Sequence, residues 1–378
     1  MKSIGIICEY NPFHNGHLYH INKIKEMYPD YKIILVMSGH FLERGDVSII
    51  NKWHKTEIAL NFGIDLIIEL PFVFASQSAD IFAYGAISIL NYLKVEKIVF
   101  GSECNDIEKL KTVASITETI DFKNNLKNYL DQGYSYPKAL DNAFKKSINF
   151  SIDSPNDLLG ISYIKAINKL NSNIEPVCIQ RTNDYNSKNT SGKISSATSI
   201  RENLKNNKPI TNFIPKYVEK YINNISLDDY FDLLKYKIIS ENDLSIFNTV
   251  DEGIENRIKK YIFKVNSLEE LIEKVKTKRY TRNKIKRMFV HILCGFTKKQ
   301  ANNLKEIRYI RVLGFNQNGR NYLNKIKKEI EIPIITNYSD IKDEMLELEF
   351  KVNGIYASIF KEKNYLSELE YKHKPVIK

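Results

Sequence analysis

The chain has 378 residues, of which 43% are apolar and 27% are charged, a composition that excludes wholesale disorder and favours two folded domains. Its 56 basic and 45 acidic residues give a formal net charge of +11, which fits either a polyanionic partner or a general enrichment in lysine.

No segment is apolar over the length of a membrane span, so no membrane partner is expected. The first ten residues read as a buried strand rather than a signal peptide, and the four cysteines form no C-x-x-C pair. A cytoplasmic protein without a zinc ribbon is therefore expected.

Apolar runs that predict strands alternate with helical patterns through the first half of the chain. The predicted strands are residues 3–9, 31–39, 64–72, 97–103 and 175–181. Helices are predicted over residues 16–27, 51–63, 78–95 and 155–170, with further helices between the last two. Such alternation is typical of an α/β fold with a parallel sheet, in which ligands bind beyond the carboxyl ends of the strands.

The carboxyl ends of the predicted strands each carry polar, glycine or charged residues. They read EYNPFHNGH, MSGHFLERGD, ELPF, FGSE and IQRTND. Because the carboxyl ends of parallel strands meet at one edge of the sheet, these stretches predict a single site there.

The pattern changes after the fifth strand. Residues 184–193 are poor in apolar side chains and predict a mobile loop. From about residue 211 helical segments dominate, including residues 276–296, although residues 332–337 read as a short strand. We therefore expect a catalytic domain over residues 1–210 and a mostly helical domain over residues 211–378.

The segment HNGH, residues 14–17, lies between the first strand and its helix. Gly16 would let a phosphate approach backbone N–H groups, and the helix N-terminus would add a positive dipole end. His14 and His17 could then donate hydrogen bonds to phosphate oxygens that gain charge during displacement. The alternatives are a metal site formed by His14, His17 and His20, or a structural role for His20.

A second motif, GKISSATSIR at residues 192–201, opens a later helix. Its hydroxyl and cationic side chains suit the oxygens of a triphosphate. These residues are Lys193, Ser195, Ser196, Thr198, Ser199 and Arg201. An ordinary N-cap would account for one hydroxyl only, and the SGK within the motif lacks the glycine and hydroxyl residue of a Walker A loop.

HNGH and ISSATSIR together resemble the class I nucleotidyltransferase superfamily, with its parallel-sheet, Rossmann-like H-x-G-H domain. The chain is more similar still to the tRNA(Met) cytidine acetate ligases. The similarity extends through GIICEYNPFHNGHLYHI, FGSE, SPNDLLGISYIKAI and IQRTNDYN to KTKRYTRNKIKRMFVHILCGF and YIRVLGFNQNGRNYL. One departure is ERGD at residues 43–46, where the family pattern is Gln-Arg-Gly-Glu.

The resemblance implies that ATP and acetate form acetyladenylate, and that the acetyl group then passes to N4 of the wobble cytidine of elongator tRNA(Met). It also implies a set of ATP contacts. They are Ile7, Cys8, Glu9, Tyr10, Asn11, Pro12, Phe13, His14, Asn15, Gly16, His17, Leu18, Tyr19 and His20 in the first loop, and Gly101, Asn156 and Arg181 elsewhere.

Acetate is a competent nucleophile, so the first step needs alignment and charge stabilisation rather than a nucleophilic side chain. His14, His17, Lys193 and Arg201 are the expected catalytic residues, with Mg²⁺ entering on the nucleotide and no metal site of the protein's own.

The segment 276–287 packs cations with Tyr280 on a predicted helix, which suits a surface that follows RNA phosphates. The expected tRNA-binding residues are Lys276, Lys278, Arg279, Arg282, Lys286 and Arg287. A solvated helix face is the plainer interpretation.

Two other functions fit parts of the pattern. A small-molecule adenylyltransferase acting on pantetheine phosphate or nicotinate mononucleotide could use the same loop, but such enzymes usually lack a basic helical domain of this length. A non-enzymatic RNA-binding protein could retain the nucleotide fold, but the intact motifs argue against decay.

Overall fold

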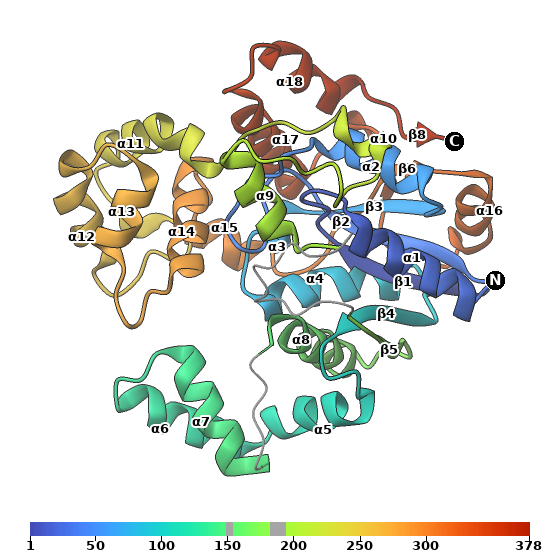
Figure 1. Ribbon diagram of the computed structural model, residues 1–378, viewed down its shortest axis with the longest axis horizontal. Helices are drawn as coiled ribbons and strands as arrows, with labels where there is room; N and C mark the ends of the chain where they lie inside the picture. Colours follow the sequence, from blue (N-terminus) through green and yellow to red (C-terminus); the bar gives the residue numbers. More distant parts are fainter. Residues whose placement is uncertain (149–153, 182–193) are drawn as a thin grey trace.

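The structure is a computed structural model that describes residues 1–148, 154–181 and 194–378. Its centre is a sheet with the strand order β5-β4-β1-β2-β3-β6-β7, in which β8 also pairs with β6 (Figure 1). The strands are β1 (Ser3–Cys8), β2 (Lys32–Ser38), β3 (Leu66–Leu70), β4 (Lys97–Ser102), β5 (Glu175–Gln180), β6 (Ile310–Phe315), β7 (Ile334–Ile335) and β8 (Val376–Ile377). The first five pair in parallel, so the predicted parallel α/β sheet is confirmed. The predicted loop at residues 184–193 lies outside the described residues.

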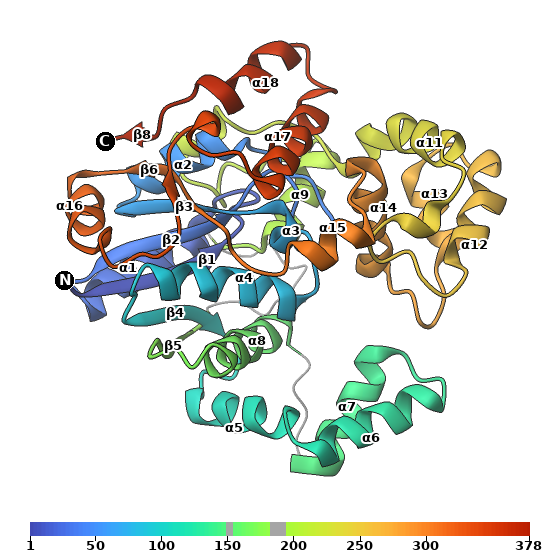
Figure 2. The same ribbon diagram turned by 180° about the vertical axis from the view of Figure 1, so that it is seen from behind.

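Helices surround the sheet and extend beyond it on one side (Figures 1 and 2). Those of the first 210 residues are α1 (Asn15–Met27), α2 (Lys52–Asn61), α3 (Phe72–Ala75), α4 (Ala79–Tyr92), α5 (Ile107–Thr117), α6 (Ile120–Asp131), α7 (Tyr136–Ile148), α8 (Pro155–Lys169) and α9 (Ala197–Lys205). Those that follow are α10 (Lys216–Glu219), α11 (Phe231–Ser240), α12 (Ile254–Tyr261), α13 (Leu268–Val275), α14 (Arg282–Cys294), α15 (Lys298–Asn303), α16 (Gln317–Ile326), α17 (Glu344–Ala357) and α18 (Lys363–Lys372). Short 3₁₀ turns occupy Leu227–Tyr230, Leu244–Ile246, Ile262–Lys264 and Tyr338–Asp340.

The strands are apolar on both faces because both faces are covered. In β2, Leu35 and Met37 pack into one hydrophobic cluster together with Ile21 of α1 and residues of α2. The alternate residues Ile34 and Val36 pack into a second cluster together with α4 and α8. The period of two along the strand thus places its side chains in two separate cores.

The sheet crosses the predicted domain boundary at residue 210. Strand β6 pairs antiparallel with β3, and β7 and β8 pair with β6 in parallel. A strand at residues 310–315 was not predicted, whereas the short strand predicted at residues 332–337 is present as β7. The division at residue 210 stays a proposal, but it does not coincide with an edge of the sheet.

A buried cluster of charged side chains links β6 and α18 to α2 and β3 of the first half of the chain. The ammonium nitrogen of Lys52 lies 2.6 Å from Oε1 of Glu69 and 2.8 Å from Oε1 of Glu370. The guanidinium of Arg311 pairs with the same two carboxylates, and Glu349 lies 3.9 Å from Lys52. Burial raises the pKa of Glu349 to about 8, which leaves two cations facing two carboxylates at neutral pH. Because each of these side chains is almost fully buried, removing one partner would cost about 3–5 kcal/mol.

Helices α11 to α14 form a helical lobe beside the sheet, and the α6–α7 hairpin projects next to this lobe (Figures 1 and 2). The helices of the second half therefore confirm the predicted helical character of that region, apart from its three strands. Among the residues that the structure describes, no helix has the length and apolar character that crossing a membrane requires.

Candidate active site

A cavity of about 690 Å³ opens at the carboxyl ends of β1, β4 and β5. Residues of α1, α8, α9 and α14 complete its wall, so both halves of the chain contribute to it. The predicted ATP-binding and catalytic residues that line it are Ile7, Cys8, Glu9, Tyr10, Asn11, His14, Gly16, His17, Tyr19, His20, Gly101, Asn156, Arg181, Ser195, Ser196, Thr198 and Arg201. The ends of strands far apart in the sequence thus come together as expected.

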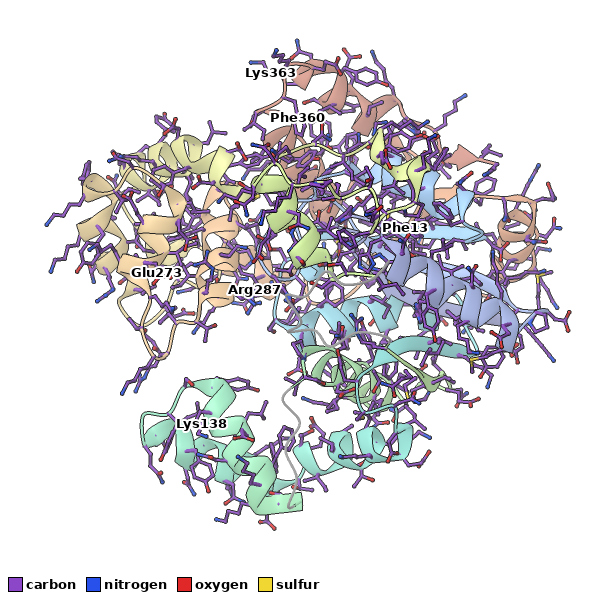
Figure 3. All side chains as sticks on the ribbon, in the orientation of Figure 1. Phe13, Lys138, Glu273, Arg287, Phe360 and Lys363 are labelled. Atoms are coloured by element: carbon purple, nitrogen blue, oxygen red, sulfur yellow. The ribbon has the colours of Figure 1, made fainter. Side chains whose placement is uncertain are left out.

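Five predicted residues are not placed on the wall. Pro12, Phe13, Asn15 and Leu18 are absent from the cavity lining in the described part of the chain. Phe13, labelled in Figure 3, is fully buried and stacks on Phe62 with ring centroids 4.8 Å apart, so it supports the loop from behind. Lys193 lies outside the described residues.

Two histidines cap the first helix with their own rings. Nδ1 of His14 accepts a hydrogen bond from the N–H of Gly16 at 3.0 Å, and Nδ1 of His17 accepts one from the N–H of His14 at 3.2 Å. The two rings stack with centroids 3.8 Å apart. A Cβ at position 16 would lie 2.8 Å from Cε1 of His14, so the space at Gly16 that the sequence suggested for a phosphate holds the His14 ring.

These hydrogen bonds fix the chemistry of both imidazoles. Because each Nδ1 accepts a backbone N–H, the proton of each neutral ring is assigned to Nε2. Burial, followed by the nearby Arg181 and Arg201, lowers the pKa of His14 to about 3. Burial and the adjacent His14 lower the pKa of His17 well below its usual value. Both rings are therefore neutral N–H donors at neutral pH, which suits oxygens that gain charge in a transition state.

His20 differs from the other two. Its Nε2 is buried without a hydrogen-bond partner, and burial, with Arg181, lowers its pKa to about 4. Among the described residues, no group of three or more His, Cys, Asp or Glu side chains is placed to hold a metal ion. The three-histidine metal site considered as an alternative therefore has no support there.

Two arginines flank the histidines. NH1 of Arg201, on α9, donates to the carbonyl oxygen of Asn11 at 2.7 Å and so ties α9 to the first loop. Arg181 follows β5, and its Nε lies 3.2 Å from Oε1 of Glu103. Nδ2 of Asn156 donates to the same oxygen at 2.5 Å. Glu103, which follows β4 in the FGSE segment, thus holds Arg181 and Asn156 together, a role that the sequence reasoning missed.

The hydroxyls at the start of α9 include one that caps the helix and others that line the cavity. Oγ of Ser196 accepts from the N–H of Ser199 at 3.1 Å and caps the helix. Ser195 and Thr198 also line the cavity. One N-cap therefore explains Ser196, while Ser199 is absent from the cavity lining in the described part of the chain. A role for Ser195 and Thr198 in ligand binding stays a prediction.

Residues 42–46, which contain the whole of the ERGD departure, form a tight loop that we call the acidic loop. It lies between the cavity and α14. Nζ of Lys286 pairs with Asp46, and NH1 of Arg287 lies 3.4 Å from Oε1 of Glu43 (Arg287 is labelled in Figure 3). Gly45 has a φ of +71°, and a Cβ there would lie 2.3 Å from the backbone nitrogen of Arg287, so only glycine lets the loop pack this closely.

The six predicted tRNA-binding residues lie on α14 or just before it, and most already have acidic partners. Arg282 pairs with Glu269 and Glu273, the latter at 3.3 Å. Lys276 lies 3.7 Å from Glu273, and Arg279 lies 3.7 Å from Glu252. Within the described ranges, no ion pair involves Lys278, which is exposed. Their role in RNA binding stays a prediction.

Comparisons with known proteins decide the family. The family model described as HIGH Nucleotidyl Transferase matches residues 1–371. A relative from Caldicellulosiruptor bescii, named tRNA(Met) cytidine acetate ligase, is 45% identical over 100% of this chain and 98% of its own. A relative of the same name from Clostridium perfringens is 41% identical over 94% of this chain and 95% of its own.

This chain belongs to the tRNA(Met) cytidine acetate ligase family. The resemblance inferred from HNGH and ISSATSIR is thereby confirmed.

Solved structures confirm the fold of this ligase family in the chain. The apo crystal structure of Thermotoga maritima TmcAL matches with a TM-score of 0.91 and 31% identity, covering 100% of this chain and 99% of that one. The same protein bound with alpha-thio ATP matches with a TM-score of 0.89 and 30% identity over the same shares. The names of the ligase relatives favour neither the adenylyltransferase nor the non-enzymatic alternative.

Proposed function

We propose that this chain activates acetate with ATP and transfers the acetyl group to N4 of the wobble cytidine of elongator tRNA(Met), giving N4-acetylcytidine. The pair of neutral imidazole donors, His14 and His17, in a cavity at the carboxyl end of β1 carries the proposal. The full-length likeness to tRNA(Met) cytidine acetate ligases supports the choice of reaction.

In the first step an acetate oxygen attacks the α-phosphorus of ATP, and the bond to the β-phosphate oxygen breaks to release pyrophosphate. Acetate is ionised at neutral pH and needs no base. Nε2–H groups of His14 and His17 stabilise the negative charge that develops on the phosphate oxygens. Arg201, fixed by Asn11, and Arg181, held by Glu103, add positive charge on two other sides of the cavity.

In the second step the cytidine amine attacks the acetyl carbonyl, and AMP leaves. The reactive anhydride must meet this amine before water does, which a cavity enclosed by the sheet, α8, α9 and α14 favours. Asn283 of α14 lines the same cavity, so the segment proposed to follow RNA phosphates reaches its wall.

ATP is the nucleotide that we assign to the cavity, since a related ligase has been crystallised with alpha-thio ATP. Mg²⁺ would enter with it, held mainly by phosphate oxygens and water, and would neutralise charge on the leaving pyrophosphate. We also propose that acetate is the acyl donor and that the protein acts in the cytoplasm.

One assay tests the proposal. Purified protein is given ATP, Mg²⁺, ¹⁴C-acetate and total tRNA, and the RNA is digested to nucleosides. We expect label in N4-acetylcytidine of elongator tRNA(Met), with ATP and acetate both required. Acetate-dependent exchange of pyrophosphate into ATP would report the first step separately.

The same assay separates the alternatives. A small-molecule adenylyltransferase would release pyrophosphate with pantetheine phosphate or nicotinate mononucleotide and leave RNA unlabelled. A non-enzymatic RNA-binding protein would retain tRNA and release no pyrophosphate. Either result would overturn the ligase assignment.

A further inference from the structure

The second step of the proposed reaction must remove a proton from the cytidine amine, and the cavity wall offers few groups that can accept it. Nδ1 of His14 and of His17 already accepts a backbone N–H, which leaves both rings as donors. Burial raises the pKa of Cys8 to about 12, so its thiol is protonated at neutral pH. Tyr10 is fully buried, and burial raises its pKa as well. Burial lowers the pKa of His20 to about 4, which makes its ring a weak base, so the stronger candidates are the carboxylates.

Three carboxylates line the cavity, and two of them are paired with cations. Oε1 of Glu43 lies 3.4 Å from Arg287. Asp46 pairs with Lys286, and its Oδ2 lies 3.7 Å from Arg201. In the chain as described, no ion pair involves Glu9, which makes it the cavity carboxylate available to take a proton.

Glu9 is also held in a defined position. It directly follows β1, and its Oε1 accepts the N–H of Glu43 in the acidic loop at 2.7 Å. Among the described residues, no ion pair joins this carboxylate to Lys55 of α2, although the charge of Lys55 lowers its pKa. The Lys55 ammonium donates instead to the carbonyl oxygens of Glu9, Ser38 and Gly39 at 3.0, 2.7 and 2.8 Å.

The surroundings of Glu9 bring its pKa close to neutral pH. Burial raises the pKa of Glu9 to about 7, with the N–H of Glu43 opposing the shift and the charge of Glu43 adding to it. Lys55 of α2 and Arg44 of the acidic loop lower the pKa. Cys8 of β1 and Tyr163 of α8, both protonated, are the other titratable groups that face it.

We propose that the carboxylate of Glu9 accepts the N4 proton of cytidine during acetyl transfer, an inference that depends on the proposed function. The N4 nitrogen forms a bond to the acetyl carbon, and the bond from that carbon to the phosphate oxygen breaks, leaving its electron pair on AMP. The proton moves from N4 to Glu9 and then to solvent. No oxidant or further reactant is required.

Glu9→Gln tests this assignment in the full chain. Glutamine keeps the size of the side chain and can still accept the N–H of Glu43, but it takes up no proton. Acetate-dependent pyrophosphate exchange reports acetyladenylate formation, and a single turnover from enzyme-bound acetyladenylate to tRNA reports transfer. We expect transfer to fall about 100-fold or more, as for loss of a general base, and exchange to fall by a much smaller factor, since Glu9 also belongs to the expected ATP contacts.

The pH profile gives a readout that a structural role would not move. Transfer by the unaltered protein should rise with pH through about 7 and then level off, because only the ionised carboxylate accepts a proton. Glu9→Gln should flatten this rise, and Glu9→Asp should restore part of the rate. Glu26→Gln, on the exposed side of α1, is the matched control and should leave exchange and transfer unchanged.

Three results would overturn the inference while leaving the ligase assignment intact: transfer by Glu9→Gln at the full rate, equal losses of exchange and transfer, or a pH profile that the variant shares with the unaltered protein. If the unaltered protein places no acetyl group on tRNA, the proposed function fails, and the role of Glu9 fails with it.

Discussion

Two regions of the molecule meet at one cavity. They differ in the charge of their side chains and in whether those side chains already form ion pairs. At the carboxyl end of β1, His14 and His17 are neutral, line the cavity and keep an Nε2–H that takes no part in capping the helix. Along α14 and the segment before it, the cations are charged, but most are paired with acids from α13 or the acidic loop.

The difference shows that pairing, more than net charge, decides what a group can bind. The formal charge of +11 counts Arg282 and Lys286 as fully as any free lysine. A cation in an ion pair must separate from its carboxylate before it binds a phosphate. A histidine whose Nδ1 caps the helix can donate its Nε2–H without breaking another contact. We therefore expect variants at the histidine end to have large effects and variants along α14 to have smaller, salt-dependent ones.

His17→Ala should have the largest effect. Loss of one donor to the developing phosphate charge is expected to slow acetyladenylate formation about 100- to 1,000-fold, or roughly 3–4 kcal/mol. Acetate-dependent pyrophosphate exchange measures it. His373→Ala removes an imidazole that stacks on Trp53 outside the cavity and serves as the control. Full exchange by His17→Ala would contradict the role of the histidine end.

His14→Asn should change how stability depends on pH. The pKa of His14 is about 3 in the folded chain and near its usual value in the unfolded one, so the unfolded chain binds more protons in acid. The stability that the neutral ring provides is present above pH 6.5 and is lost as the pH falls toward 3. Asparagine can still cap Gly16 but does not titrate, so the drop in unfolding free energy between pH 7 and 5 should shrink by about 2 kcal/mol.

Urea unfolding at the two pH values measures this difference. His20 and His17 remain in both proteins, so part of the pH dependence should persist. An unchanged drop would show that His14 is protonated in the folded chain at pH 5.

Combined replacement of Lys276, Lys278, Arg279 and Arg282 by alanine should weaken tRNA binding about tenfold, or roughly 1.4 kcal/mol, and reduce its salt dependence. ATP binding should not change, because none of the four lines the cavity in the described part of the chain. A salt titration of tRNA affinity is the measurement. An unaltered slope would remove this segment from the RNA surface.

Glu269→Gln should have the smallest effect and the opposite sign. It removes one of the two exposed ion pairs of Arg282 and leaves the pair with Glu273, and such pairs are worth about 0.2–1 kcal/mol, so tRNA affinity at low salt should rise at most about fivefold. Glu368→Gln, which frees Lys372 on α18, is the matched control. Weaker tRNA binding by Glu269→Gln would mean that the pair, rather than the free cation, contacts RNA.

Much of the first half was predictable because its signals are local. The continuous apolar runs of the strands, the glycine at the end of α2 and the polar strand ends sufficed to place the sheet and the cavity. Strand β6 was missed because Arg311 interrupts its apolar run. The arginine is almost fully buried there, and its partners Glu69 and Glu370 lie far away in the sequence.

The functional residues that were missed also depend on distant partners. Nothing in the local sequence distinguishes Glu103 from other charged residues. Its partners Arg181 and Asn156 reach it only because β5 and α8 fold beside β4. The pairing of Asp46 with Lys286 joins residues 240 positions apart, and no local pattern signals it. Sequence alone therefore identified most of the groups that line the cavity, but not the acids that hold or neutralise them.

The buried cluster around Lys52 has a consequence for how the protein is made. Lys52 lies in the first fifth of the chain, while Arg311 and Glu370 are translated near its end. Until those late segments emerge from the ribosome, the half that carries the nucleotide cavity lacks a neighbouring strand and two of its counter-charges. Catalytic competence should consequently appear only after synthesis is nearly complete, and a protein shortened before position 370 should be left without it.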